Sequence, residues 1–308
     1  MDKVFTVAQV VMPIFAAIFL GMHAKKKSLL SPEGIRGLQQ FVMNFGLPCV
    51  VFNSCLKADI GSEALTSMGL VLPLMILASV AAFRARKKFP YHNLPQLFAA
   101  QETGMLGIPL FMILFGADQA YRMGVLDLAQ APVAFPVIAI LSANTGENPT
   151  PMGIFKKVLA SPLLIMSLLG LALNLSGIGA WMDAVGIGGV ITESTSFLAQ
   201  PVSALMIFSV GYNFSLEKGN RKDIFRISAI HFAVQAVFCL VIQGILFLLP
   251  NVNVLTRWAI LMYCTLPGSY LAPSLGREEK DFTMASGVCS LLTVVSLIAF
   301  CCMAAMVA

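Results

Sequence analysis

Charged residues are scarce in this chain: they make up 11% of its 308 residues, whereas 58% are hydrophobic. Soluble domains carry about 25% charged residues, so the composition excludes an ordinary soluble domain. The longest polar links, Asn144 to Lys157 and Ser215 to Arg226, are too short to fold by themselves. The sequence therefore predicts an all-α integral membrane protein with one membrane domain, residues 1–308.

Residues typical of catalytic and cofactor sites are also missing. All seven cysteines lie in apolar runs, and no CxxC, HExxH or Walker sequence occurs. Two tryptophans and three histidines are too scattered for a haem or metal cage. No nucleophile–base pair stands out either. We therefore expect no enzyme activity, no cofactor and no metal site.

The first apolar run, Val4 to Ala24, lacks the features of a signal peptide. Asp2 and Lys3 leave no net positive charge before it, and Lys25 to Lys27 follow it without a small-residue cleavage site. This pattern predicts a retained first helix whose N-terminus lies outside.

Ten apolar segments approach the roughly 20 residues that a helix needs to cross a bilayer. The fourth and the ninth are interrupted by glycine and proline. The expected spans are 4–24, 37–56, 64–83, 94–115, 123–143, 157–176, 189–213, 225–249, 254–274 and 282–306.

Basic residues support this count, because sixteen of the twenty fall in alternate connections. By the positive-inside rule these connections are cytoplasmic, and both termini lie on the outer face of the cytoplasmic (inner) membrane. Topology then accounts for the net charge of +5 without a nucleic-acid partner. Basic runs such as Arg84 to Lys88 are expected to contact membrane lipid headgroups.

Prolines recur in the two halves of the chain at a spacing of about half its length. This indicates a duplication, with repeat one at 1–147 and repeat two at 153–308. Because five spans per repeat is an odd number, the second copy is inverted, as in many secondary transporters. The pairs are Pro13 and Pro162, Pro48 and Pro201, and Pro109 and Pro267.

The interruption in the fourth segment predicts a broken helix. Gly104 lets the backbone leave helical geometry, and Pro109 removes an amide hydrogen. The free N–H groups of the following half-helix would favour an anion, and Pro267-Gly268 repeats the arrangement in the ninth segment. The two breaks are expected to meet at a central substrate site. Ordinary proline kinks are the alternative.

The stretch Glu102 to Leu110, ETGMLGIPL, resembles the fourth-helix crossover motif of the auxin efflux carrier family, which includes bacterial malonate and other organic-acid permeases. Asn44 to Pro48 is similar to that family's second helix, and Leu266 to Gly276 with Asp281 to Ser290 to its ninth and tenth. The resemblance implies ten helices in two inverted five-helix repeats with broken crossover helices 4 and 9. It further implies a scaffold of 4–24, 37–56, 157–176 and 189–213, and a transport domain of 64–83, 94–115, 123–143, 225–249, 254–274 and 282–306.

Glu102 departs from the family pattern, which commonly has Asn at this position. Burial favours the neutral form of a carboxyl group, so Glu102 is a candidate for proton coupling. It could instead bind sodium, or simply hydrogen-bond an unwound carbonyl.

Other polar residues form stripes at helical spacing, which either line a pathway or join helices. Asn44 and Gln200 are the stronger pathway candidates, because each lies near a repeat-related proline. Asp127 and Glu193 are expected to be solvated near the outer ends of their spans. The other stripes include His231 with Gln235, and Ser286 with Ser290 and Thr293.

These features predict a secondary-active transporter of a small organic anion that works by alternating access, with proton coupling through Glu102. A sodium-coupled anion symporter is the nearest alternative, and a membrane receptor or scaffold that binds without transport is an alternative of another class. The sequence leaves a homodimer open. The expected substrate-binding residues are Glu102, Thr103, Gly104, Pro109, Pro267, Gly268, Ser269, Asn44 and Gln200.

Overall fold

The computed structural model describes residues 2–58, 62–142, 160–214, 220–250 and 252–307. Within these ranges every regular element is a helix. The α-helices are α1 Asp2–Lys26, α2 Pro32–Phe41, α3 Leu47–Leu56, α4 Ser62–Ala85, α5 Leu94–Ala99, α6 Ile108–Phe115, α7 Ala120–Ser142, α9 Pro162–Leu175, α10 Ile178–Ala184, α11 Ile187–Ala199, α12 Val202–Asn213, α13 Arg221–Leu248, α14 Val254–Tyr263 and α15 Glu279–Val307. Short π-helical turns occupy Val42–Gly46 (η1) and Thr103–Gly107 (η2), and 3-10 turns occupy Ala117–Gln119 (η3) and Pro273–Leu275 (η4).

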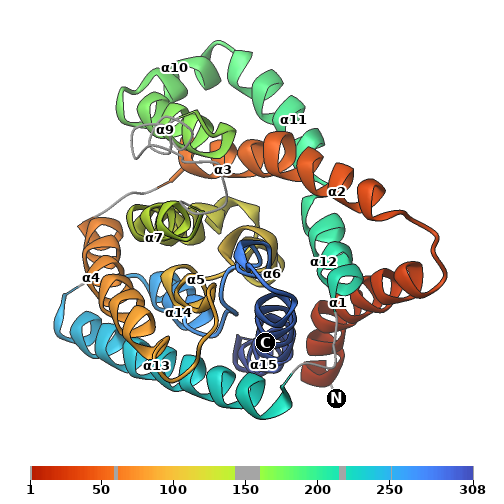
Figure 1. Cartoon of the computed structure of the whole chain (residues 1–308). Helices are drawn as coiled ribbons and strands as arrows, with labels where there is room; N and C mark the ends of the chain where they lie inside the picture. The colour runs from red at the N-terminus through yellow and green to blue at the C-terminus, as the bar shows by residue number, and fades with distance from the viewer. Residues whose placement is uncertain (1, 59–61, 143–159, 215–219, 251, 308) are drawn as a thin grey trace.

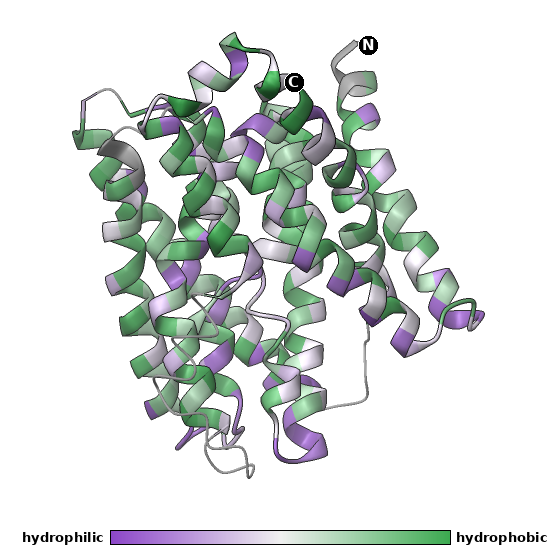
Figure 2. Ribbon diagram, turned by 90° about the horizontal axis from the view of Figure 1, so that it is seen from above, coloured by the Kyte–Doolittle hydropathy of each residue, from purple (hydrophilic) through white to green (hydrophobic). Residues whose placement is uncertain are grey.

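By length and apolar composition, six described helical segments can cross a membrane, or seven if the bent pair α9 and α10 is one span. The chain is therefore a multi-pass membrane protein. Figure 2 shows these helices in mainly hydrophobic colours along their length, with the start of α1 and the end of α15 at the same end of the bundle. The six are Val7–Lys26, Leu65–Ala85, Ala117–Ser142, Ile187–Asn213, Arg221–Leu248 and Glu279–Val307.

Several expected spans differ from the helices observed. Three of them, 37–56, 94–115 and 254–274, are not among these membrane-crossing segments of the described chain. The start of the expected span 157–176 lies outside the described residues, and α9 begins at Pro162 behind the N-cap Ser161. Gly177, at φ +75°, then turns the chain by 76° into α10, which was not expected. The expected span 189–213 is divided near Pro201 into α11 and α12, since proline lacks the amide hydrogen that would continue the ladder.

One group of helices, α1–α3 and α9–α12, runs along the upper and right side of Figure 1. Helices α1 and α12 pack closely, since a Cβ on Gly21 would lie 2.1 Å from the Phe208 carbonyl oxygen. A Cβ on Gly170 of α9 would likewise lie 2.7 Å from the Phe52 oxygen of α3. Glycine at these positions lets the helix backbones touch, as small residues do in membrane helix packing.

The second group contains α4–α7 and α13–α15, which lie together at the lower left of Figure 1. A loop between α4 and α5 ties its members together. Tyr91 donates a hydrogen bond of 2.8 Å to Asp223 at the start of α13, and the His92 amide donates one of 3.0 Å to buried Asp281 of α15. Burial, followed by the Asp223 contact, raises the pKa of Tyr91 to about 12, so its hydroxyl remains a donor at neutral pH.

Candidate functional site

Two extended segments cross at the centre of the second group, between α5 and η2 and after α14. The Glu102 amide donates to the Pro267 oxygen at 2.9 Å, and the Ser269 amide donates to the Ala100 oxygen at 3.0 Å. Gln101 and Gly268 form an isolated antiparallel bridge between these bonds. The two breaks therefore meet, as expected, and we call residues 100–102 and 267–269 the crossover.

Gln130 of α7 clamps the first strand of the crossover. Its oxygen accepts a hydrogen bond of 2.7 Å from the Gln101 amide, and its nitrogen donates one of 3.0 Å to the Gln101 carbonyl. Tyr263, the last residue of α14, donates to the same Gln130 oxygen at 2.9 Å. One side chain thus satisfies both backbone groups of a residue that has no helical partner in the membrane interior.

Glu102 links the two breaks. One carboxylate oxygen accepts a hydrogen bond of 3.2 Å from the Met105 amide in η2, and the other accepts one of 2.7 Å from the Tyr270 amide. The end of the half-helix that was expected to hold an anionic substrate is therefore capped by Glu102 in this conformation. The N–H of Ser269, another expected donor, is used within the crossover.

Asp127 is not solvated at a helix end, as the sequence suggested. Its side chain is half-buried and accepts hydrogen bonds from the Thr103 hydroxyl and, at 2.9 Å, from Gln130 Nε2. Helix α7 contacts the crossover through Gln130, and Asp127, one turn before Gln130, therefore lies beside the crossover as well. Glu193, by contrast, is exposed.

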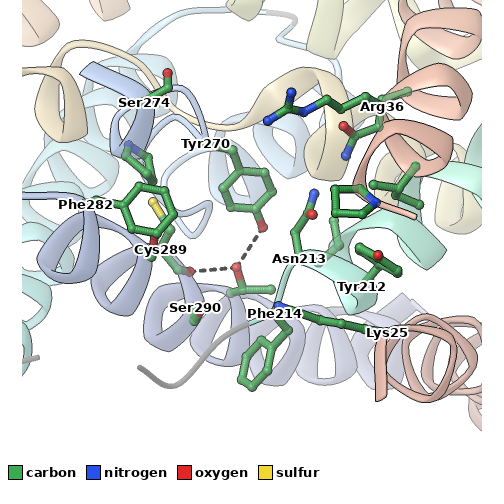
Figure 3. Close-up of a pocket in the computed structure, with 17 residues that line it drawn as sticks. Lys25, Arg36, Tyr212, Asn213, Phe214, Tyr270, Ser274, Phe282, Cys289 and Ser290 are labelled. Carbon is green, nitrogen blue, oxygen red and sulfur yellow. Dashed lines mark hydrogen bonds between the residues drawn. The ribbon is translucent and has the colours of Figure 1, made fainter. Parts of the chain in front are cut away.

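A cavity of about 360 Å³ lies between the two helix groups. Tyr270, directly after the crossover, lines it, and the Tyr270 hydroxyl lies 2.7 Å from Thr293 Oγ1 of α15 (Figure 3). Ser286 and Ser290, from the polar stripe identified in the sequence, line the same wall. The stripe therefore faces a cavity.

The opposite wall is basic. Lys25 at the end of α1 and Arg36 of α2 line the cavity, together with Gln39 and Asn213. Figure 3 shows Arg36 and Asn213 across from Cys289 and Ser290. No Asp or Glu is among the described residues that line it. The cavity therefore carries a net positive charge at neutral pH and suits an anion.

The expected site residues fall into two places. Glu102, Thr103, Pro267, Gly268 and Ser269 form or adjoin the crossover. Gly104 follows in η2, and buried Pro109 lies in the first turn of α6. The exposed residues Asn44 in η1 and Gln200 after α11 lie in the other helix group, away from the cavity lining.

Several residues of the site were not singled out from the sequence. Lys25 and Arg36 were used only to predict the orientation of the chain in the membrane. They are far in sequence from the two breaks, so the sequence does not indicate that they line the same cavity as Tyr270. Gln130 could have been found, because it lies one turn after Asp127 in an apolar span. For Tyr270, the sequence showed only that the residue lies within the second break, and nothing in it indicated a role in binding.

Similarity to known proteins identifies the family of this chain. A family described as "Membrane transport protein" matches residues 6–304, nearly the whole chain. A protein of Methanothermobacter thermautotrophicus described as an uncharacterized transporter is 24% identical over 300 residues, which cover 94% of this chain and 95% of the relative. The extent of the family match confirms the resemblance first suggested by the residues after Glu102: the chain belongs to the membrane transport protein family of auxin efflux carriers.

Proposed function

We propose that this protein is a secondary-active carrier of a small organic anion that works by alternating access in the cytoplasmic membrane. The observation that carries the proposal is the basic cavity, which lies between the two helix groups and ends at Tyr270 beside the crossover. A substrate there would touch both groups, so relative movement of the groups would carry it across. No enzyme activity is part of the proposal.

We further propose that the chain is built from two inverted five-helix repeats, an arrangement suited to this mechanism. Helix α1 packs on α12 and α3 on α9, which are equivalent pairs if the halves are related by inversion. Gly21 follows Pro13 at the same spacing at which Gly170 follows Pro162, and each of these glycines makes a close backbone contact. The ten spans, the outward termini, and the division into scaffold and transport helices belong to this proposal.

Transport is tested by counterflow of small carboxylates in proteoliposomes. Lys25→Gln and Arg36→Gln should each raise the half-saturating substrate concentration several-fold, because each removes a positive charge facing the anion. Lys26→Gln is the matched control, as Lys26 lies in the same basic run but does not line the cavity. Equal effects at Lys25 and Lys26 would contradict a substrate site in the cavity. Saturable binding without counterflow would favour a receptor.

Proton coupling through Glu102 is part of the same proposal. A neutral carboxyl group has one oxygen that carries a proton and is a weaker acceptor, so it holds the Met105 and Tyr270 amides less firmly than the carboxylate does. Protonation would therefore loosen the link between the two breaks and could be coupled to movement.

The coupling is tested with Glu102→Gln in vesicles. Uptake should fall, and its dependence on pH should weaken, because the amide cannot titrate. Unchanged uptake with unchanged pH dependence would refute coupling through Glu102. A requirement for sodium at constant pH would instead favour the sodium symporter.

A further inference from the structure

Buried oxygens without a hydrogen-bond partner occur on two helices that contact each other. In the part of the chain that the structure describes, four side-chain oxygens are of this kind, and their residues are between 0% and 4% exposed. Two belong to the start of α5 and two to α13. They are Asn93 Oδ1, Gln96 Oε1, Ser228 Oγ and Gln235 Oε1.

These residues lie on α5 and α13, which are joined by contacts of His231 and Gln235. Asn93 and Gln96 are one turn apart at the start of α5, and Ser228 and Gln235 share a face of α13 with His231. His231 joins the two helices, because it hydrogen-bonds the Leu97 backbone and its ring centre lies 5.1 Å from that of Phe98. We call this α5–α13 interface the polar seam.

The polar seam reaches the crossover. With the Gln101 amide oriented so that its nitrogen faces the Leu266 and Pro267 carbonyls, at 3.0 and 3.2 Å, its oxygen accepts from Gln235 Nε2. At the other end, Asn93 Nδ2 donates to the carbonyls of Ala272 and Asp281, at 2.8 and 3.0 Å, while its oxygen has no partner. The seam thus extends from the α4–α5 loop to Gln101.

Water is the ligand that this chemistry selects. A buried polar atom without a partner is costly, and native proteins satisfy such atoms with internal water, which typically makes about three hydrogen bonds. Uncharged hydroxyl and amide oxygens offer acceptors to a neutral donor, and no cluster of three metal-ligating side chains occurs among the described residues. We propose that a chain of internal water molecules occupies the polar seam and connects the α4–α5 loop with the crossover.

Such a chain would give protons a route to the crossover. Gln101 precedes Glu102, so water at the seam would end next to the group that is proposed to exchange a proton. This role rests on the proposed function, whereas the water site itself does not.

Radiolytic hydroxyl-radical labelling with mass spectrometry tests the water site in wild-type protein in lipid nanodiscs. Synchrotron pulses generate radicals from bound water inside the protein, so a buried side chain reacts when water lies beside it. His231, 1% exposed, should react several-fold faster than Phe111 and Phe300, 0% and 1% exposed, after correction for intrinsic reactivity. Equal corrected rates would overturn the proposal.

A double variant, Gln96→Leu with Ser228→Ala, should lower the labelling of His231 by removing two acceptors. If the variant does not fold, the wild-type rates still decide. In proteoliposomes the double variant should lower uptake several-fold, while substrate should still raise its melting temperature as much as that of the wild type. Ser209→Ala is the control, because the Ser209 hydroxyl bonds within its own helix. Unchanged uptake would overturn the proton route. A wild type that labels but does not transport would instead refute the proposed function.

Discussion

At the residue scale, Glu102 occupies the position that an anion would take at the end of a broken helix. Each of its oxygens accepts an amide hydrogen from a different break, so the side chain joins two segments that are far apart in sequence. Asparagine, common in the family at this position, would offer one acceptor oxygen and a donor nitrogen that faces an N–H group. The carboxylate therefore makes the crossover of this chain more tightly closed than an amide would.

Glu102→Gln should consequently destabilise the protein. The free energy of unfolding should fall by about 1.5–3 kcal/mol, because one charge-assisted hydrogen bond is lost and the new side-chain NH2 faces the Tyr270 N–H. A thermal unfolding series in detergent at neutral pH would measure it. Glu193→Gln is the control, because Glu193 is exposed and a substitution there should change the stability by less than about 0.5 kcal/mol. Equal stability of the two variants would show that the Glu102 link is not formed.

At the scale of the element, the two breaks differ in what their glycines do. Gly268 is required by a close approach of two backbones, because a Cβ there would lie 2.4 Å from the Leu97 carbonyl oxygen. Gly104 has more room, since its nearest neighbour would be Met43 Cε at 3.7 Å, an ordinary contact. The first break therefore depends on the π-helical turn and the Gln130 clamp more than on the small size of Gly104.

Alanine substitutions separate these two glycines. Gly268→Ala should cost about 1–3 kcal/mol or more, since backbone must move to admit the methyl group. Gly104→Ala should change the stability by less than roughly 1 kcal/mol. Both are measured by thermal unfolding and by expression of folded protein. A tolerated Gly268→Ala would mean that Gly268 lies further from the Leu97 carbonyl of α5 than the 2.4 Å approach implies.

At the scale of the whole molecule, the contact of α3 with α7 is one of the places where the two helix groups meet, and the cavity lies elsewhere between them. Buried Ser54 of α3 donates to the Asp118 carbonyl at 2.9 Å and accepts from the Tyr121 amide at 2.7 Å, which links α3 to the start of α7. The cavity opens instead among Lys25 and Arg36, on the side that the charge pattern assigns to the cytoplasm. In the proposed cycle this conformation is open to the cytoplasm.

Ser54→Ala should shift the protein away from this conformation, since it removes both hydrogen bonds between the groups. Loss of about 1–2 kcal/mol would change the ratio of conformations roughly fivefold or more. Cys289, a cavity-lining thiol, reports the change: its modification by a polar reagent, measured by peptide mass spectrometry, should slow down. Ser209→Ala should leave the rate unchanged, because its hydroxyl bonds to Leu205 of its own helix. Faster modification in Ser54→Ala would refute the assignment.

Much of the crossover was predictable from residue types. Gly104, Pro109, Pro267 and Gly268 are unusual in apolar spans, and their recurrence in both halves pointed to one meeting point, which the backbone bonds confirm. The helix ends were less predictable, as at Gly177, because local glycine conformation decides where a chain turns. Partners such as Gln130 for Gln101 depend on contacts between spans, which composition does not encode.

The sequence by itself determined that this chain is a helical membrane protein with broken helices, because a bilayer admits few alternatives to apolar helices and penalises every unpaired backbone group. The tertiary structure decided what fills the break and where charge gathers. It brought the Glu102 carboxylate to the Tyr270 amide, and it set Lys25 and Arg36 around one cavity with Tyr270. These contacts join residues from distant spans, whose meeting depends on how whole helices pack.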